Sequence, residues 1–109
     1  MRSLLILFPL VGLAVPAVAA ESHPPPDSAT FETIVKPFLA RTCTTCHGST
    51  LKTANLDLEA YGTPASVARD VSTWEKVVAK LRRHDMPPVG LPRPDEVEIK
   101  AVTGYGASQ

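Results

Sequence analysis

The sequence has no surplus of charge of either sign, since eleven Lys and Arg residues balance eleven Asp and Glu residues. Proteins that bind nucleic acid through its phosphates usually carry a clear basic surplus. The chain is also short, at 109 residues, and few of its residues are aromatic. A chain of this size builds at most one small domain, near the lower limit for a self-sufficient apolar core. We therefore expect a single domain and no nucleic-acid partner.

No apolar run reaches the length of an ordinary membrane-spanning helix, which needs about 20 residues. The run from Leu4 to Val15 is interrupted by Pro9, follows a positive charge at Arg2 and precedes small residues that end at Ala20. This order is typical of a secretory signal peptide. We therefore predict a signal peptide over residues 1–20 and a periplasmic or secreted protein. A retained segment, which would anchor the chain to a membrane, is the alternative.

Cysteine is rare as well, but both cysteines lie in one short motif. Cys43, Cys46 and His47 have the spacing C-x-x-C-H, which is typical of a c-type haem attachment site. In such a site both sulfurs bond the porphyrin edge and the histidine nitrogen binds the iron. If residues 43–47 form one helical turn, the three side chains project from one face. The motif therefore predicts one covalent haem c, which would also complete the small core.

Other interpretations of the two thiols are a redox-active dithiol, half of a zinc site, a structural disulfide or chance. Export would allow a disulfide to persist, so the adjacent His47 decides in favour of haem. A thiol–disulfide exchange protein would need the alternating strands and helices of a thioredoxin-like fold, which the sequence pattern lacks. A structural zinc site needs four ligands, and His23 and His84 are poorly placed to supply them.

The segments beside the motif are predicted from their composition and apolar spacing. Three prolines among polar residues predict an extended tether over residues 21–29. Apolar residues recur at helical spacing over residues 31–39 and lead directly to Cys43. Pro37 is expected to kink this helix or divide it into two pieces. Gly48 is expected to end it in the left-handed conformation.

The second half of the chain predicts further short helices. Residues 51–58 are predicted as a loop, because no partner strand appears. A brief helix is expected over residues 64–69, and Ser72 with Glu75 matches a capping box that begins an amphipathic helix. A last short helix is expected to begin at Pro94. The predicted fold class is therefore all-α, with three to four short helices around one covalent haem.

One methionine, Met86, remains after the predicted signal peptide. Pro87 and Pro88 follow it, so they exclude it from helical geometry and stiffen its loop. A methionine is ordinarily a core residue. With an iron on His47, however, Met86 would serve as the sixth ligand, and His84 is the rival for that position.

Four segments together resemble the planctomycete-type cytochrome c domain over about residues 31–102. They are the C-x-x-C-H motif, the loop with Leu56-Asp57-Leu58, the helix with Trp74-Glu75-Lys76-Val77, and Met86-Pro87-Pro88 followed by Pro92-Arg93-Pro94.

The resemblance implies a fold similar to that of the small all-helical cytochromes c. It implies thioether bonds at Cys43 and Cys46, a proximal ligand at His47 and a distal ligand at Met86. Such domains usually lie at the N-terminus of large exported bacterial proteins. The expected partners are therefore a redox protein or fused oxidoreductase domains.

The expected cytochrome c-like domain spans residues 30–103, and residues 104–109 are expected to be a disordered or truncated tail. Members of the family normally continue through a longer last helix that bears aromatic residues. We therefore expect this chain to be a truncated member, with an incomplete contact between its first and last helices.

The expected function is the transfer of single electrons through a His/Met-ligated haem, with both axial positions occupied. The alternative is a haem enzyme, or a module that binds peroxide or a gas at an open distal position. Arg83 and His84 are the only nearby candidates for a second catalytic group in that alternative.

Overall fold

The computed structural model describes residues 12–17 and 28–106. Within these residues it is helical and contains no β-strand, which confirms the predicted all-α class at the level of secondary structure. No helix of the described part is both long and apolar enough to cross a membrane. Most of the predicted signal peptide, including its cleavage site after Ala20, lies outside the described residues.

The first helical segment consists of three consecutive pieces: α1 (Ser28–Thr30), the π-helical η1 (Phe31–Val35) and α2 (Lys36–Thr42). The predicted tether over residues 21–29 is therefore wrong at its end, because the helix begins at Ser28. Residues 21–27 lie outside the described part. Three helical residues therefore precede Phe31, which is fully buried. Their carbonyls can accept backbone hydrogen bonds from the next turn of the helix.

The disturbance expected at Pro37 takes the form of a widened turn. The Lys36 amide donates to the Phe31 carbonyl, five residues back, in place of the usual four. Proline has no amide hydrogen and crowds the turn before it, and a π-helical turn adjacent to it accommodates both effects. The helix therefore continues to Thr42 and delivers the cysteine motif at its end.

The segment predicted as a loop, residues 51–58, contains the 3₁₀ turn η2 (Thr53–Asn55), and a second 3₁₀ turn, η3 (Leu58–Ala60), begins at its last residue. No strand forms there, as expected. Helix α3 (Pro64–Ala68) follows where a brief helix is expected, and the Thr63 side chain caps it by accepting from the Ser66 amide.

Helix α4 (Val71–Arg82) begins two residues earlier than the predicted cap at Ser72 implies. The capping box of Ser72 and Glu75 is wrong, because the Asp70 carboxylate accepts from the Thr73 amide and caps the helix. The hydroxyl of Tyr61 donates to the same carboxylate at 2.6 Å. This tertiary contact fixes Asp70 at the cap, and the sequence around Ser72 does not reveal it.

Helix α5 (Glu96–Gly104) ends directly before Tyr105, which is buried. The Tyr105 ring lies 5.6 Å from Phe31 and 6.1 Å from Trp74, measured between ring centroids. The Trp74 indole nitrogen donates to the Tyr105 carbonyl at 3.1 Å. Residues 104–106 therefore belong to the folded domain and not to the expected tail over residues 104–109, and the first and last helical segments are in contact. Residues 107–109 lie outside the described part.

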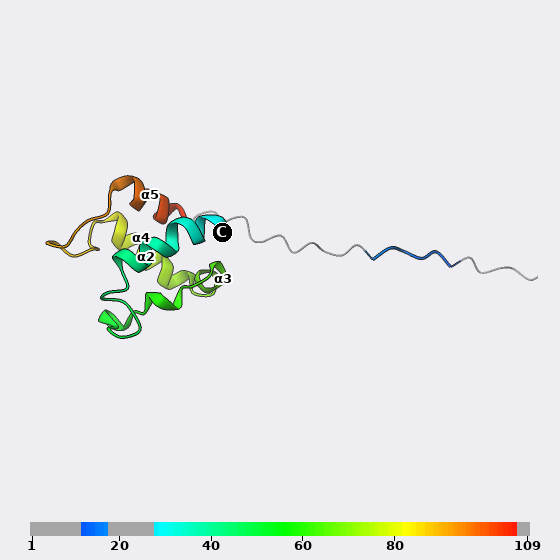
Figure 1. The fold of residues 1–109 in the computed structure, drawn as a ribbon, viewed down its shortest axis with the longest axis horizontal. Helices are drawn as coiled ribbons and strands as arrows, with labels where there is room; N and C mark the ends of the chain where they lie inside the picture. Colours follow the sequence, from blue (N-terminus) through cyan, green and yellow to red (C-terminus); the bar gives the residue numbers. More distant parts are fainter. Residues whose placement is uncertain (1–11, 18–27, 107–109) are drawn as a thin grey trace, which may run out of the picture.

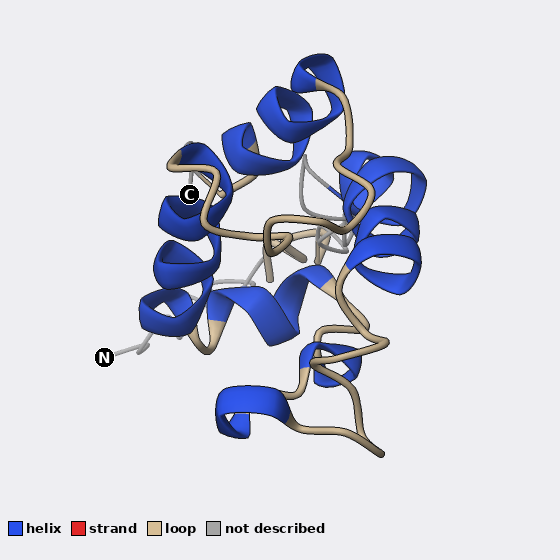
Figure 2. Ribbon diagram, turned by 90° about the vertical axis from the view of Figure 1, so that its left-hand side faces the viewer, coloured by secondary structure: helices blue, strands red, loops and turns tan. Residues whose placement is uncertain are grey.

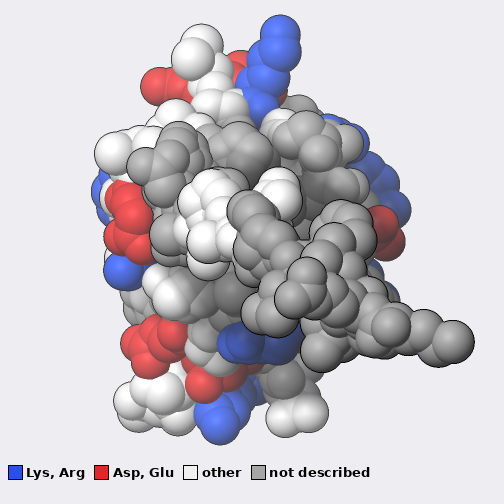
Figure 3. All heavy atoms as spheres, turned by 90° about the vertical axis from the view of Figure 1, so that its right-hand side faces the viewer, with Lys and Arg blue, Asp and Glu red and all other residues white. Residues whose placement is uncertain are grey.

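The helices enclose one core (Figures 1 and 2). Helix α5 packs against α4 and η1, α3 packs against α4, and α2 packs against η3. On the face drawn in Figure 3, basic and acidic side chains are interspersed. The buried apolar residues are Phe31, Val35, Phe38, Leu39, Leu58, Tyr61, Val67, Trp74, Val77, Leu81, Ile99, Val102 and Tyr105.

Candidate functional site

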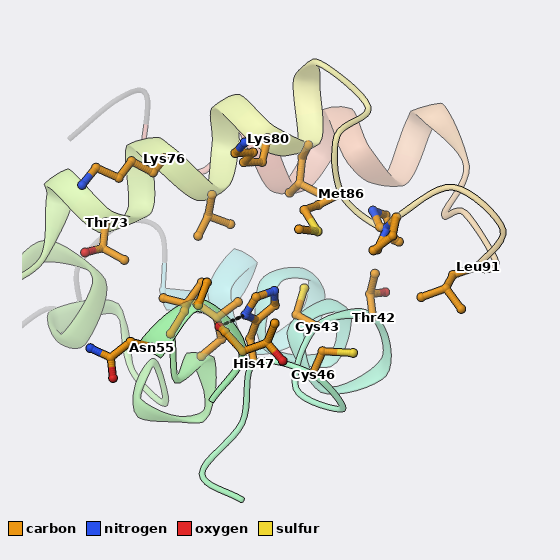
Figure 4. A pocket seen from close by; sticks show the side chains of 18 residues that line it. Thr42, Cys43, Cys46, His47, Asn55, Thr73, Lys76, Lys80, Met86 and Leu91 are labelled. Carbon is orange, nitrogen blue, oxygen red and sulfur yellow. Dashed lines mark hydrogen bonds between the residues drawn. The ribbon is translucent and has the colours of Figure 1, made fainter. Parts of the chain in front are cut away.

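The cysteine motif forms one helical turn directly after α2, as the sequence predicts. The Cys43 amide donates to the Leu39 carbonyl, and the His47 amide donates to the Cys43 carbonyl, both at 2.9 Å. This turn presents Cys43, Cys46 and His47 to a single cavity (Figure 4). The three side chains can therefore contact one ligand.

The cavity has a volume of about 450 Å³, which is within the usual range of about 300–1,000 Å³ for ligand pockets. Four parts of the chain surround it: the cysteine motif, residues 53–58, helix α4 and residues 86–91. Its apolar lining comes from both halves of the chain. It includes Ala54, Leu56, Leu58, Val77, Leu81, Pro87, Pro88 and Leu91.

The His47 ring is oriented by a backbone carbonyl. Its Nδ1 lies 2.8 Å from the Thr53 oxygen (Figure 4). A carbonyl oxygen can only accept, so Nδ1 carries the hydrogen and donates it. In the neutral ring this leaves the lone pair on Nε2, which is the arrangement found in metal-binding histidines.

Gly48 has a different role from the one expected. Its φ is not in the left-handed region, and the described glycines that do have positive φ are Gly90 and Gly106. A Cβ at position 48 would lie 2.3 Å from the Thr44 carbonyl oxygen, far inside contact distance. Glycine is therefore required here because the backbone after His47 passes close to the motif turn.

The two thiols do not form a disulfide. Burial raises the pKa of Cys43 to about 11, so this residue is a neutral thiol near pH 7. A protein that carries out thiol–disulfide exchange reacts through a cysteine thiolate, and the pKa of that cysteine is normally lowered. The raised pKa of Cys43 therefore disfavours the thiol–disulfide exchange alternative. Within residues 12–17 and 28–106, no three His, Cys, Asp or Glu side chains are placed to hold a metal ion as a zinc site requires.

Met86 lines the same cavity from the loop between α4 and α5. In Figure 4 it lies on the side of the cavity opposite His47. The Met86 and Asp85 amides both donate to the Lys80 carbonyl, at 3.4 and 3.0 Å. The structure thus brings Met86 together with the motif, although the two are far apart in the sequence.

The rival ligand His84 is not among the cavity-lining residues of the described part. Its Nδ1 lies 3.3 Å from a guanidinium nitrogen of Arg93, and its Nε2 lies 3.6 Å from the Glu96 carboxylate. Arg83 pairs with Asp85 at 3.1 Å. The structure therefore brings neither candidate for a second catalytic group into the cavity.

Sequence reasoning missed three polar residues that line the cavity away from the cysteines. Asn55, Thr73 and Lys76 lie toward one end of it in Figure 4, and Cys46 lies toward the other. It also missed the Thr53 carbonyl. The helical spacing of Lys76 and Lys80 could have indicated that both lie on one face of α4. The Thr53 carbonyl could not have been found, because every residue has a backbone carbonyl.

Comparisons of the chain with protein families, with curated proteins and with solved structures gave no match.

Proposed function

We propose that this protein is an exported electron-transfer domain that carries one haem c, attached through Cys43 and Cys46 and ligated by His47 and Met86. One observation carries the proposal: these four side chains line a single cavity, although Met86 comes from a distant loop. The C-x-x-C-H spacing supplies the chemical identity of the ligand.

The residues present fit this group. A haem is a flat apolar ring with carboxylates on the half away from its vinyl groups, and the cavity has an apolar middle. Its thiols lie toward one end and Asn55, Thr73 and Lys76 toward the other. An imidazole nitrogen and a thioether sulfur are ligands that haem iron accepts. The donor set and the distribution of polarity therefore agree.

When bound, the haem would supply reversible one-electron chemistry. The two sulfurs would hold it covalently, and the Thr53 carbonyl would keep the Nε2 lone pair of His47 available. Met86 would supply the second iron ligand and raise the potential relative to a second imidazole, since soft sulfur favours reduced iron. The apolar lining would exclude water from the metal. Electrons would pass to a redox protein, or to fused oxidoreductase domains, through a small transient contact.

The test is to express the exported chain in a host that has haem-attachment machinery, denature the protein and record its absorption spectrum. We expect the haem spectrum to remain with the unfolded chain. The matched control is the double variant Cys43→Ala/Cys46→Ala, which should lose the haem on denaturation. A wild-type protein that releases its haem, or contains none, would contradict the proposal.

A further inference from the structure

We propose that Arg93 is a positioning residue that holds the loop of Met86 in the arrangement needed for iron ligation. The inference rests on the proposed function, because it concerns how the distal ligand is presented. Arg93 does not line the cavity and would not touch the haem.

Arg93 contacts residues that lie before and after Met86 in the sequence. Its Nη2 donates to the His84 carbonyl at 3.1 Å and to the Pro87 carbonyl at 3.2 Å. Its Nη1 lies 3.3 Å from His84 Nδ1, which must accept because a guanidinium can only donate. One side chain therefore ties together the backbone before and after Met86.

Helix α4 holds the same loop through backbone hydrogen bonds. The Asp85 and Met86 amides share the Lys80 carbonyl, and the His84 amide donates to the Leu81 carbonyl at 3.1 Å. His84 has a left-handed φ of 60°, a conformation that costs a non-glycine residue free energy and needs support from its surroundings. The end of α4 and Arg93 together supply that support.

A lysine could not make the same set of contacts. A guanidinium is planar and presents five N–H donors in a fixed arrangement, whereas an ammonium is a compact point charge on a flexible stem. Pro87 is buried, so its carbonyl depends on a protein donor more than an exposed carbonyl would. The contacts thus suit arginine specifically.

The restraint matters because a methionine side chain is flexible and does not by itself fix the position of its sulfur. It has three rotatable bonds and adapts to irregular surroundings, so the position of its sulfur depends on where the backbone is held. A ligand must be supported by residues around it to reach its productive geometry. We therefore expect that without Arg93 the Met86 sulfur leaves the iron at a lower temperature than that at which the domain unfolds.

The experiment compares Arg93→Gln with Arg83→Gln in the haem-loaded protein. Both variants remove one positive charge next to the same loop, but Arg83 contacts only the exposed Asp85 carboxylate among the contacts described, which Lys80 also approaches. The first measurement is hydrogen exchange at the Asp85 and Met86 amides. We expect exchange to be on the order of tenfold faster in Arg93→Gln and nearly unchanged in Arg83→Gln.

The second measurement follows the sulfur-to-iron charge-transfer band and the helical circular dichroism during heating. In Arg93→Gln the band should disappear at a lower temperature than the helices unfold, with Arg93→Lys restoring it in part. A merely structural role would shift both transitions together, and that result would overturn the proposal. Unchanged amide exchange in Arg93→Gln would overturn it too.

The two proposals fail in different ways. Wild-type protein without covalent haem would contradict the proposed function. Amide exchange at Asp85 and Met86 would still show whether Arg93 holds the loop. Faster exchange in Arg93→Gln, combined with a charge-transfer band as stable as that of the wild type, would show that Arg93 orders the loop without positioning Met86.

Discussion

Each proposed iron ligand is oriented by a residue that is not itself a ligand. The Thr53 carbonyl fixes the hydrogen on His47 Nδ1, and Arg93 bonds the carbonyls on either side of Met86. Such supporting contacts set the direction of a ligand's lone pair and the freedom of its side chain. At this scale the site therefore depends on residues that a motif search does not find.

Replacement of Met86 by alanine should remove the distal ligand from the haem-loaded protein. We expect the sulfur-to-iron charge-transfer band to disappear and the reduction potential to fall, because a thioether stabilises the reduced iron. Absorption spectroscopy and potentiometry measure both changes. His84→Asn is the matched control and should retain the band, since His84 lies outside the cavity lining and asparagine tolerates its left-handed φ. A band that survives in Met86→Ala but is lost in His84→Asn would assign the distal position to His84.

Replacement of Gly48 by alanine should destabilise the domain through a steric clash. The new Cβ would lie 2.3 Å from the Thr44 carbonyl oxygen, and relief of such overlap typically costs about 1–3 kcal/mol. Urea denaturation measures the change in the free energy of unfolding. Gly62→Ala is the control, because nothing lies within 4 Å of the position of its Cβ. Equal effects of the two substitutions would contradict the role assigned to Gly48.

At the scale of whole elements, helix starts show how local signals compete with tertiary contacts. The cap at Thr63 follows the local sequence, whereas α4 begins at Val71 because Asp70, held by Tyr61, serves as its cap. The Tyr61 hydroxyl and the Thr73 amide both favour the ionised carboxylate of Asp70 and lower its pKa. Helix α4 should therefore be sensitive to acid.

The stability supplied by the ionised Asp70 should depend on pH in a defined direction. Because the folded-state pKa is lowered, this stabilisation is present above the unfolded pKa of about 3.9 and is lost as pH falls through the folded value. Asp70→Asn should therefore be less stable than the wild type near pH 7. The difference should shrink between about pH 5 and pH 2.

Chemical denaturation across this pH range measures that difference directly. Tyr61→Phe removes the hydrogen bond that lowers the pKa of Asp70 most. This variant should therefore lose less stability than the wild type as the pH falls. A stability difference between Asp70→Asn and the wild type that stays constant from pH 7 to pH 2 would contradict the assignment.

At the scale of the molecule, the aromatic cluster of Phe31, Trp74 and Tyr105 closes the domain. It joins the first helical segment, α4 and the residues just beyond α5. An ion pair between Arg41 and Glu98 adds a second link between α2 and α5. The chain therefore brings its first and last helical segments together through this cluster and this ion pair.

Replacement of Tyr105 by alanine should destabilise the whole domain, because loss of a buried aromatic ring typically costs about 3–5 kcal/mol. Thermal or urea unfolding of the haem-loaded protein measures the effect. Val97→Ala in α5 is the control; its side chain is 80% exposed, and such surface changes usually stay within about 0.5 kcal/mol. A Tyr105→Ala variant as stable as this control would place Tyr105 outside the cooperative core.

Much of the helical pattern could be predicted from the sequence. The apolar face of α4 is one example, since Trp74, Val77 and Leu81 are buried as their spacing requires. The role of Gly48 and the start of α4 could not be predicted. Both depend on which atoms from other parts of the chain come close, and residue type alone does not specify that.

The sequence by itself determined the helical class, the motif turn and the chemical nature of its donors, because apolar periodicity and the C-x-x-C-H spacing act over a few neighbouring residues. Only the tertiary structure decided that Met86 and not His84 enters the cavity, that Thr53 orients His47, and that Tyr105 belongs to the core. These outcomes depend on contacts between segments far apart in the sequence, and local apolar spacing does not specify such contacts. The packing of the whole chain therefore selects among them.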